Sequence, residues 1–141
     1  MIVGILFCSN HGKAIESIDH ELLSIAEQNK AIAQAYYTAM AEKNIFALEK
    51  YLDEDVLFIA PLATVIGKQA FLERVQEFFA SCATLTIEVV LSSCDQAVVL
   101  FVLDYPAPIG IVEAVALLDI DQGYINKIKL FYDVRLFDKK S

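Results

Sequence analysis

The chain has 141 residues, of which 57% are apolar and 21% are charged, and its formal net charge is −8. The longest stretches without a charged residue are residues 1–12 and 56–67. Both are shorter than the roughly 18 apolar residues of a membrane-spanning helix, and the charge content excludes disorder. Because no basic residue lies between Arg74 and Lys127, neither nucleic acid nor an anionic membrane is an expected partner.

Residues 1–20 are predicted to form an N-terminal extension ahead of a single domain, residues 21–141. The apolar start of the chain lacks the basic residues and the cleavage pattern of a signal peptide, so we expect an arm that packs on the domain or on a neighbour. The three cysteines, Cys8, Cys82 and Cys94, are odd in number and form no CxxC pair. This favours free thiols in a reducing, cytoplasmic setting.

Apolar residues at steps of three and four predict a long helix over residues 17–43. Ser24 marks a second possible start if this helix is broken. Asn44 is expected to end the helix, because asparagine readily takes the left-handed conformation found at helix ends.

A short helix is predicted over residues 45–51, followed by a turn over residues 52–55 and a strand over residues 56–60. Pro61 closes this strand, since proline cannot donate to a sheet ladder. Residues 68–80 then form an amphipathic helix, whose apolar side chains share a single stripe.

Four β-rich runs follow, over residues 84–91, 97–105, 111–120 and 125–137. Short turn-like segments separate them, so neighbouring strands should pair antiparallel. Helices followed by a meander of strands are typical of an α+β protein, here with a curved sheet wrapped around the helices.

Two of these strands, residues 97–103 and 111–120, are rich in apolar residues on both faces. An antiparallel sheet with one face in water normally alternates apolar and polar residues. The helices can cover only the concave face of the sheet. We therefore expect a second copy of the chain to cover part of the convex face in a symmetric homodimer.

At this point the sequence resembles a known superfamily. Segments between residues 35 and 56 (AYYTAM, NIFAL and YLDEDV) are similar to the opening of nuclear transport factor 2-like, or SnoaL-like, domains. Pro61 with residues 67–71 (GKQAF) resembles their link into the third helix, and residues 121–137 resemble their ending. The resemblance implies a cone-shaped α+β fold, with three helices on a strongly curved, mostly antiparallel sheet, a pocket between them, and a dimer.

The superfamily includes ketosteroid isomerases, which use a helix tyrosine, a strand aspartate as base and a protonated second aspartate. The resemblance places Tyr36 at the tyrosine position and Ala60 at the base. The second aspartate falls at about Ala116, with Glu113 nearby only if the register is shifted. Because both aspartates are missing, isomerisation of a steroid by this set of groups is not expected.

Asp133, near the end of the last predicted strand, is the leading catalytic candidate, with Tyr36 or Tyr132 as a hydrogen-bond donor. A carboxylate at the mouth of an apolar pocket can act as an acid or a base. Strand alternation instead places Asp133 on the outer face, where it pairs with Arg135 or Lys129 or caps a turn, unless a β-bulge turns it inward. Asp104 is either a second pocket carboxylate or, as we favour, the end of its strand.

The expected pocket is mainly apolar. Tyr132 should point into it together with Tyr36, Tyr105 should lie at its rim, and Tyr37 at the edge of the helix stripe. The expected apolar walls are Phe58, Leu62, Phe71, Phe79 and Leu118.

Two functions fit these features. One is an enzyme with isomerase, cyclase or dehydratase chemistry on a small hydrophobic molecule, with Asp133 as acid or base. The other is a non-catalytic dimeric module for ligand binding or association. His11 and His20 have no metal-ligand neighbour three or four residues on, so we expect neither a metal nor a cofactor.

Overall fold

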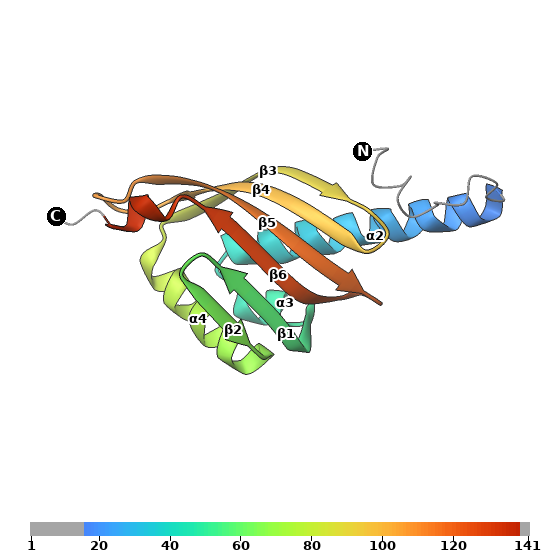
Figure 1. Cartoon of the computed structure of the whole chain (residues 1–141), viewed down its shortest axis with the longest axis horizontal. Helices are drawn as coiled ribbons and strands as arrows, with labels where there is room; N and C mark the ends of the chain where they lie inside the picture. Colours follow the sequence, from blue (N-terminus) through green and yellow to red (C-terminus); the bar gives the residue numbers. More distant parts are fainter. Residues whose placement is uncertain (1–15, 139–141) are drawn as a thin grey trace.

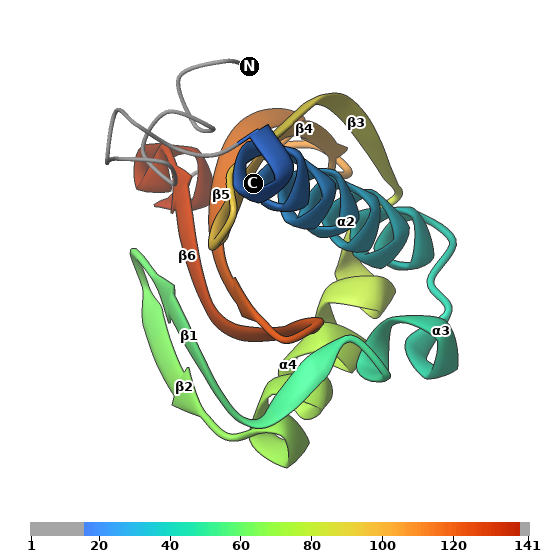
Figure 2. The same cartoon turned by 90° about the vertical axis from the view of Figure 1, so that its right-hand side faces the viewer.

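A computed structural model describes residues 16–138 of the chain. Three helices, α2 (Glu16–Ala41), α3 (Ile45–Glu49) and α4 (Lys68–Ser81), pack on a curled six-stranded sheet (Figures 1 and 2). The strands are β1 (Leu52–Ala60), β2 (Ala63–Ile66), β3 (Thr84–Ser92), β4 (Gln96–Asp104), β5 (Ile111–Asp121) and β6 (Tyr124–Tyr132), and a 3-10 helix, η1 (Val134–Asp138), follows them. The expected α+β class is confirmed.

The part of the extension that was predicted to form an arm, together with His11, lies outside the described residues. Within residues 16–138, no helix is both long enough and apolar enough to cross a membrane.

The sheet has the strand order β2-β1-β6-β5-β4-β3. Strands β3 to β6 form the predicted antiparallel meander, whereas β1 pairs parallel with β6 and makes the sheet mixed. Gln122 and Gly123 join β5 to β6, with φ angles of 51° and 87°. Two successive positive φ angles fit the tight hairpin turn whose twist matches that of the strands. In Figure 2 the sheet curls around the helices, which leaves its other face outside.

The end of α2 differs from the prediction. The helix runs unbroken from residue 16, so no second start occurs at Ser24. Lys43, with φ of 57°, takes the left-handed conformation that was expected at Asn44. Asn44 instead caps α3, because its side-chain oxygen accepts a hydrogen bond of 3.1 Å from the backbone N–H of Ala47. The Lys43 ammonium donates to the Cys82 carbonyl at 2.7 Å and ties α2 to the end of α4.

Residues 52–55, predicted as a turn, are the start of β1. Leu52 pairs with Ile125, and a bulge precedes Leu57. The charged residues fit a strand here because β2 pairs only with the later part of β1, from Leu57 onward. The early part of β1 therefore has an open edge, where carboxylates meet solvent.

The last predicted strand, over residues 125–137, is too long. Strand β6 ends at Tyr132, and the following residues form η1. Asp133 causes the change of direction, because its carboxylate accepts a hydrogen bond of 3.0 Å from the backbone N–H of Arg135. A side chain that bonds to the backbone two residues on competes with the sheet ladder.

Polar contacts fix α2 to the β3–β4 hairpin. The buried Asn29 side chain donates to the Ser93 carbonyl at 3.1 Å, and the Ser92 hydroxyl donates to the Ala26 carbonyl at 2.7 Å. These bonds hold the helix over the concave face of the sheet, where it forms one wall of the core.

The cysteines depart in part from the expectation of free thiols. Cys82 is buried and free, and its burial raises the pKa of the thiol. Cys94 is disulfide-bonded, so the expectation is wrong for this residue. Spacing along the chain could not show this, because pairing depends on which cysteines the fold brings together. The expectation for Cys8 lies outside the described residues.

Candidate functional site

A pocket of about 160 Å³ lies between helices α2 and α4 and the concave face of the sheet. This volume is close to that of an apolar cavity of about 150 Å³, which holds benzene. The pocket is therefore large enough for one small ring. Its lining residues are Tyr36, Tyr37, Met40, Phe58, Phe71, Arg74, Val75, Phe78, Leu85, Phe101, Leu103, Ile128 and Leu130.

One wall comes from α4. Phe71, Arg74, Val75 and Phe78 are spaced three and four residues apart, so they share one face of the helix. Phe71 and Val75 are buried, and the Phe71 ring lies 4.9 Å from the ring of Phe58 on β1. The Arg74 side chain is 57% exposed, which places it at the open end of the pocket.

The opposite wall comes from α2. The Tyr36 and Tyr37 rings meet edge to face, with 4.9 Å between their centres, and the Tyr37 ring lies 4.8 Å from that of Phe101 on β4. Tyr37, expected at the edge of the helix stripe, is buried. Because α2 contacts both β3 and β4, two adjacent positions of the helix are covered at once.

The Tyr36 hydroxyl is the unusual group of the site. It is buried, and no group in the described part of the chain pairs with it by a hydrogen bond. Burial, and secondarily the neighbouring Tyr37, raises the pKa of Tyr36 well above its ordinary value. Tyr36 therefore stays protonated near neutral pH and keeps a hydrogen-bond donor inside an apolar surrounding.

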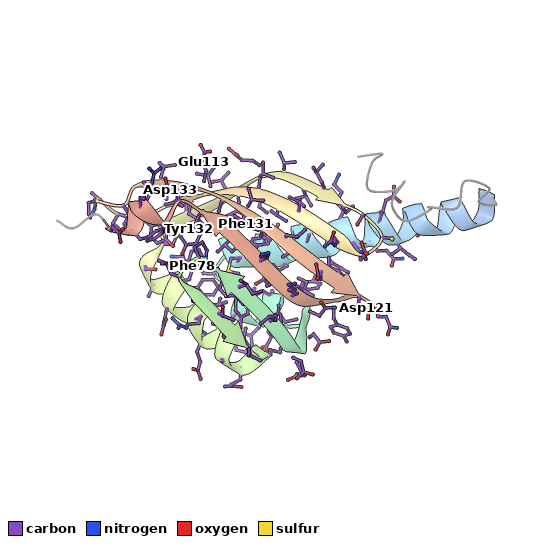
Figure 3. The ribbon with its side chains drawn as sticks, in the orientation of Figure 1. Phe78, Glu113, Asp121, Phe131, Tyr132 and Asp133 are labelled. Carbon is purple, nitrogen blue, oxygen red and sulfur yellow. The ribbon has the colours of Figure 1, made fainter. Side chains whose placement is uncertain are left out.

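Asp133, the leading catalytic candidate, is not among the residues that line the pocket. Figure 3 shows it at the end of β6, just before η1. Its carboxylate accepts hydrogen bonds from the Arg135 side chain at 2.9 Å and 2.7 Å, and this pairing raises the pKa of Arg135. Among the lining residues that the structure describes, none is Asp or Glu. An acid–base role for Asp133 stays a prediction, without a place in the pocket.

Tyr132 and Tyr105, expected inside the pocket and at its rim, lie in an aromatic cluster beside it. Both rings pack edge to face on Phe137 of η1, with centres 5.2 Å apart in each case. Phe78 connects this cluster to the pocket, since its ring lies 6.4 Å from that of Tyr105. Partial burial raises the pKa of both tyrosines.

Only some of the residues predicted as apolar walls line the pocket. Phe58 and Phe71 line the pocket. Leu118 is fully buried in the core, Phe79 is partly buried against it, and Leu62 is 66% exposed in the β1–β2 turn.

The other acidic candidates lie away from the pocket. Asp104 is exposed at the end of β4, as favoured. Glu113 is exposed on β5, above the sheet in Figure 3. Ala116 is buried on the opposite face of β5. Within residues 16–138, no group of three or more His, Cys, Asp or Glu residues could hold a metal ion.

Sequence reasoning missed most of the sheet residues in the lining, and it also missed Arg74. The stripe on residues 68–80 already contained Val75 and Phe78. The available signal was that Arg74 lies three residues after Phe71 and four before Phe78, because positions three and four apart share a helix face.

A curled mixed sheet around three helices, with an apolar pocket between them, defines a nuclear transport factor 2-like protein. Residues 33–128 match the SnoaL-like domain, and the chain belongs to this family. No curated protein matches the sequence significantly.

Solved structures share the fold at low sequence identity. Bal32a from a soil-derived mobile gene cassette is 16% identical, with a TM-score of 0.74 over 81% of this chain and 96% of that one. A candidate ketosteroid isomerase from Kribbella flavida DSM 17836 is 21% identical, with a TM-score of 0.69 over 77% of this chain and 79% of that one. A protein with a ketosteroid isomerase-like fold from Catenulispora acidiphila DSM 44928, in complex with trimethylamine, is 19% identical, with a TM-score of 0.64 over 73% of this chain and 85% of that one. Likeness at this level shows the fold alone.

Proposed function

We propose that this protein binds a small hydrophobic molecule in the pocket, and that the Tyr36 hydroxyl donates a hydrogen bond to an oxygen of that molecule. The observation that carries the proposal is the buried Tyr36 hydroxyl without a partner, in a lining whose other residues are apolar except for Tyr37 and Arg74. A buried polar group without a partner costs about 1–3 kcal/mol. A ligand carbonyl would remove this cost, whereas a pure hydrocarbon would not.

Binding has better support than acid–base catalysis. Isomerase, cyclase or dehydratase chemistry through Asp133 needs a carboxylate in contact with the ligand. Asp133 is held by Arg135 outside the lining, and the described lining residues include no other carboxylate. We therefore favour the non-catalytic module over the enzyme.

Paired probes test the proposal. Acetophenone and ethylbenzene have nearly the same shape, but only acetophenone carries a carbonyl oxygen. We expect NMR titration to show acetophenone binding about five-fold more tightly, the equivalent of one hydrogen bond of about 1 kcal/mol. The variant Tyr36→Phe should remove this preference and leave the affinity for ethylbenzene unchanged.

Two results would contradict the proposal. Equal affinity of the wild type for both probes would show that the hydroxyl recognises no oxygen. If neither probe shifts the signals of residues in the pocket, the pocket does not bind small rings at all.

A cationic ligand is a second candidate. The Catenulispora relative was crystallised with trimethylamine, and aromatic rings such as those of Tyr37 and Phe101 attract ammonium groups. Arg74 disfavours a cation, because it places a like charge at the mouth. Titration with trimethylamine tests this candidate, and tight binding would favour it over a neutral ligand.

We further propose that the protein is a homodimer through the outer face of the sheet. Val89, Leu100, Val115 and Phe131 lie side by side on this face, across β3, β4, β5 and β6. Val89, Val115 and Phe131 are 36–47% exposed in a single copy.

A second copy of the chain is the occupant that we assign to this face. Lys129 and Glu113 lie on the same face, so charges of both signs are available to pair across a symmetric interface. Light scattering at micromolar concentration should give twice the mass of one chain. A monomer at that concentration would contradict the dimer.

A further inference from the structure

We infer that the ligand of the pocket is a small apolar molecule with a carboxylate in addition to the oxygen that Tyr36 binds, and that the Arg74 guanidinium binds this carboxylate at the mouth. This inference rests on the proposed function, because it names the class of molecule that fills the same pocket. It starts from the distribution of charge. Among the lining residues that the structure describes, Arg74 is the only one with a charged side chain.

The position of Arg74 fits a group that reaches a ligand from the rim. Phe71 and Phe78 lie about one turn before and after it on α4, and all three residues line the pocket. The Arg74 side chain is 57% exposed. A lining residue that is this exposed fits the common arrangement of arginine at the border of an apolar surface, in which the apolar stem packs on the surface and the charged head meets solvent.

The hydrogen-bonding capacity of Arg74 is unused within the described part of the chain. Its one close acid is Glu77, with 3.7 Å between nitrogen and oxygen, and this exceeds the length of a hydrogen bond. Both side chains are more than half exposed, so this ion pair contributes little. Arg135 provides the contrast, because it already donates two short hydrogen bonds to Asp133.

A carboxylate suits this arrangement chemically. The guanidinium presents five N–H donors in a planar fork, which matches the two oxygens of a carboxylate. The apolar lining and the volume of about 160 Å³ accept one small ring, while the carboxylate stays at the mouth. The protein as a whole carries a formal charge of −8 and repels anions. An anion that binds must therefore depend on a local cation.

Three probes with the same ring test the inference. Benzoate, benzamide and benzylamine carry a negative, a neutral and a positive group. We expect NMR titration at neutral pH to show benzoate binding about five-fold more tightly than benzamide, the size of an exposed ion pair of about 1 kcal/mol. Benzylamine should bind most weakly. Arg74→Gln should remove the advantage of benzoate and leave the affinity for benzamide unchanged.

Two variants control for overall charge and for competition. Lys30→Gln removes one positive charge from an exposed position of α2 outside the lining, and it should keep the benzoate preference. Glu77→Gln removes the acid beside Arg74, so it should strengthen benzoate binding.

The outcomes separate the inference from the proposed function. If benzamide and acetophenone bind but benzoate has no advantage, the carboxylate inference is wrong and the proposed function stands. If Arg74→Gln and Lys30→Gln lose the same amount of benzoate affinity, the inference is also wrong, because the preference for benzoate would then come from the net charge of the protein. If no aromatic probe binds, both the carboxylate inference and the proposed function are wrong.

Discussion

The two faces of strand β5 are both rich in apolar side chains, but they differ in what covers them. On the concave face, Ala116 and Leu118 are fully buried under the helices and against the neighbouring strands. On the convex face, Ile111 is 57% exposed and Val115 is 36% exposed. Apolar content therefore does not tell which face is the core. The acidic residue Glu113 marks the convex face, because a charge is not tolerated on the other side.

The largest expected effect on stability comes from placing a charge on the concave face. Ala116→Asp places an unpaired charge between the buried Val99 on β4 and the partly buried Leu130 on β6. We expect a loss of about 3–5 kcal/mol in the free energy of unfolding, measured by urea denaturation. Val115→Asp, one residue earlier and on the other face, should still fold at room temperature by circular dichroism. Equal damage from both variants would contradict the difference between the faces.

The same convex-face variant should change assembly. Val115 lies between Leu100 and Phe131 in the row that we assign to the dimer interface. Two copies related by symmetry would bring two new carboxylates together there, so Val115→Asp should be monomeric in light scattering. Phe131→Asp should behave in the same way. If the wild type is a dimer and both variants remain dimers, the interface lies elsewhere.

High pH should lower the free energy of unfolding, because the tyrosines buried on the concave side must then ionise. Tyr36 has a pKa raised from 10.0, so the folded state binds more protons than the unfolded chain above that pH. Its contribution to stability is complete below pH 10 and is lost as the pH rises toward the pKa of the folded state. The expected loss is about 1.4 kcal/mol per pH unit for each such tyrosine. Tyr37, whose pKa burial also raises, adds to the slope.

Urea denaturation at several pH values above 10 measures this slope. Tyr36→Phe should flatten it by the share of one tyrosine. An unchanged slope in this variant would mean that the Tyr36 phenol ionises as easily in the folded state as in the unfolded chain.

At neutral pH, Tyr36→Phe should not destabilise the protein. The hydroxyl has no hydrogen-bond partner within the described residues, so its removal relieves a buried polar group rather than breaking a bond. We expect a gain of up to about 1 kcal/mol in the free energy of unfolding. A clear loss would show that the hydroxyl is satisfied in solution, for example by a bound water.

Local patterns were enough to predict much of the fold. The period of the apolar residues placed α2 and α4, and the turn-like segments separated the four strands of the meander. The parallel pairing of β1 with β6 was not predicted, because it joins segments far apart in the chain. The η1 turn was missed because it depends on one side chain, Asp133, bonding to the backbone of Arg135.

The site was harder to predict than the fold. Tyr36, Phe58 and Phe71 were found, since they combine apolar character with a regular spacing or a family motif. In the sequence, Arg74 is an ordinary charged residue on a helix. It lines the pocket because its face of α4 is turned toward the pocket. Asp133 was a candidate because it is a carboxylate in a family motif. In the structure it pairs with Arg135 and does not line the pocket.

The smallest expected effect concerns Asp133. Asp133 is exposed, so its ion pair with Arg135 contributes little, and an asparagine keeps an oxygen for the bond from the Arg135 backbone N–H. Asp133→Asn should therefore leave the urea midpoint nearly unchanged. Because Asp133 does not line the pocket, the affinity for acetophenone should also be unchanged in NMR titration. Arg74→Gln is the matched comparison, since it changes a charged residue that does line the pocket. A marked loss of ligand affinity in Asp133→Asn would place this carboxylate at the ligand after all and would revive the acid–base alternative.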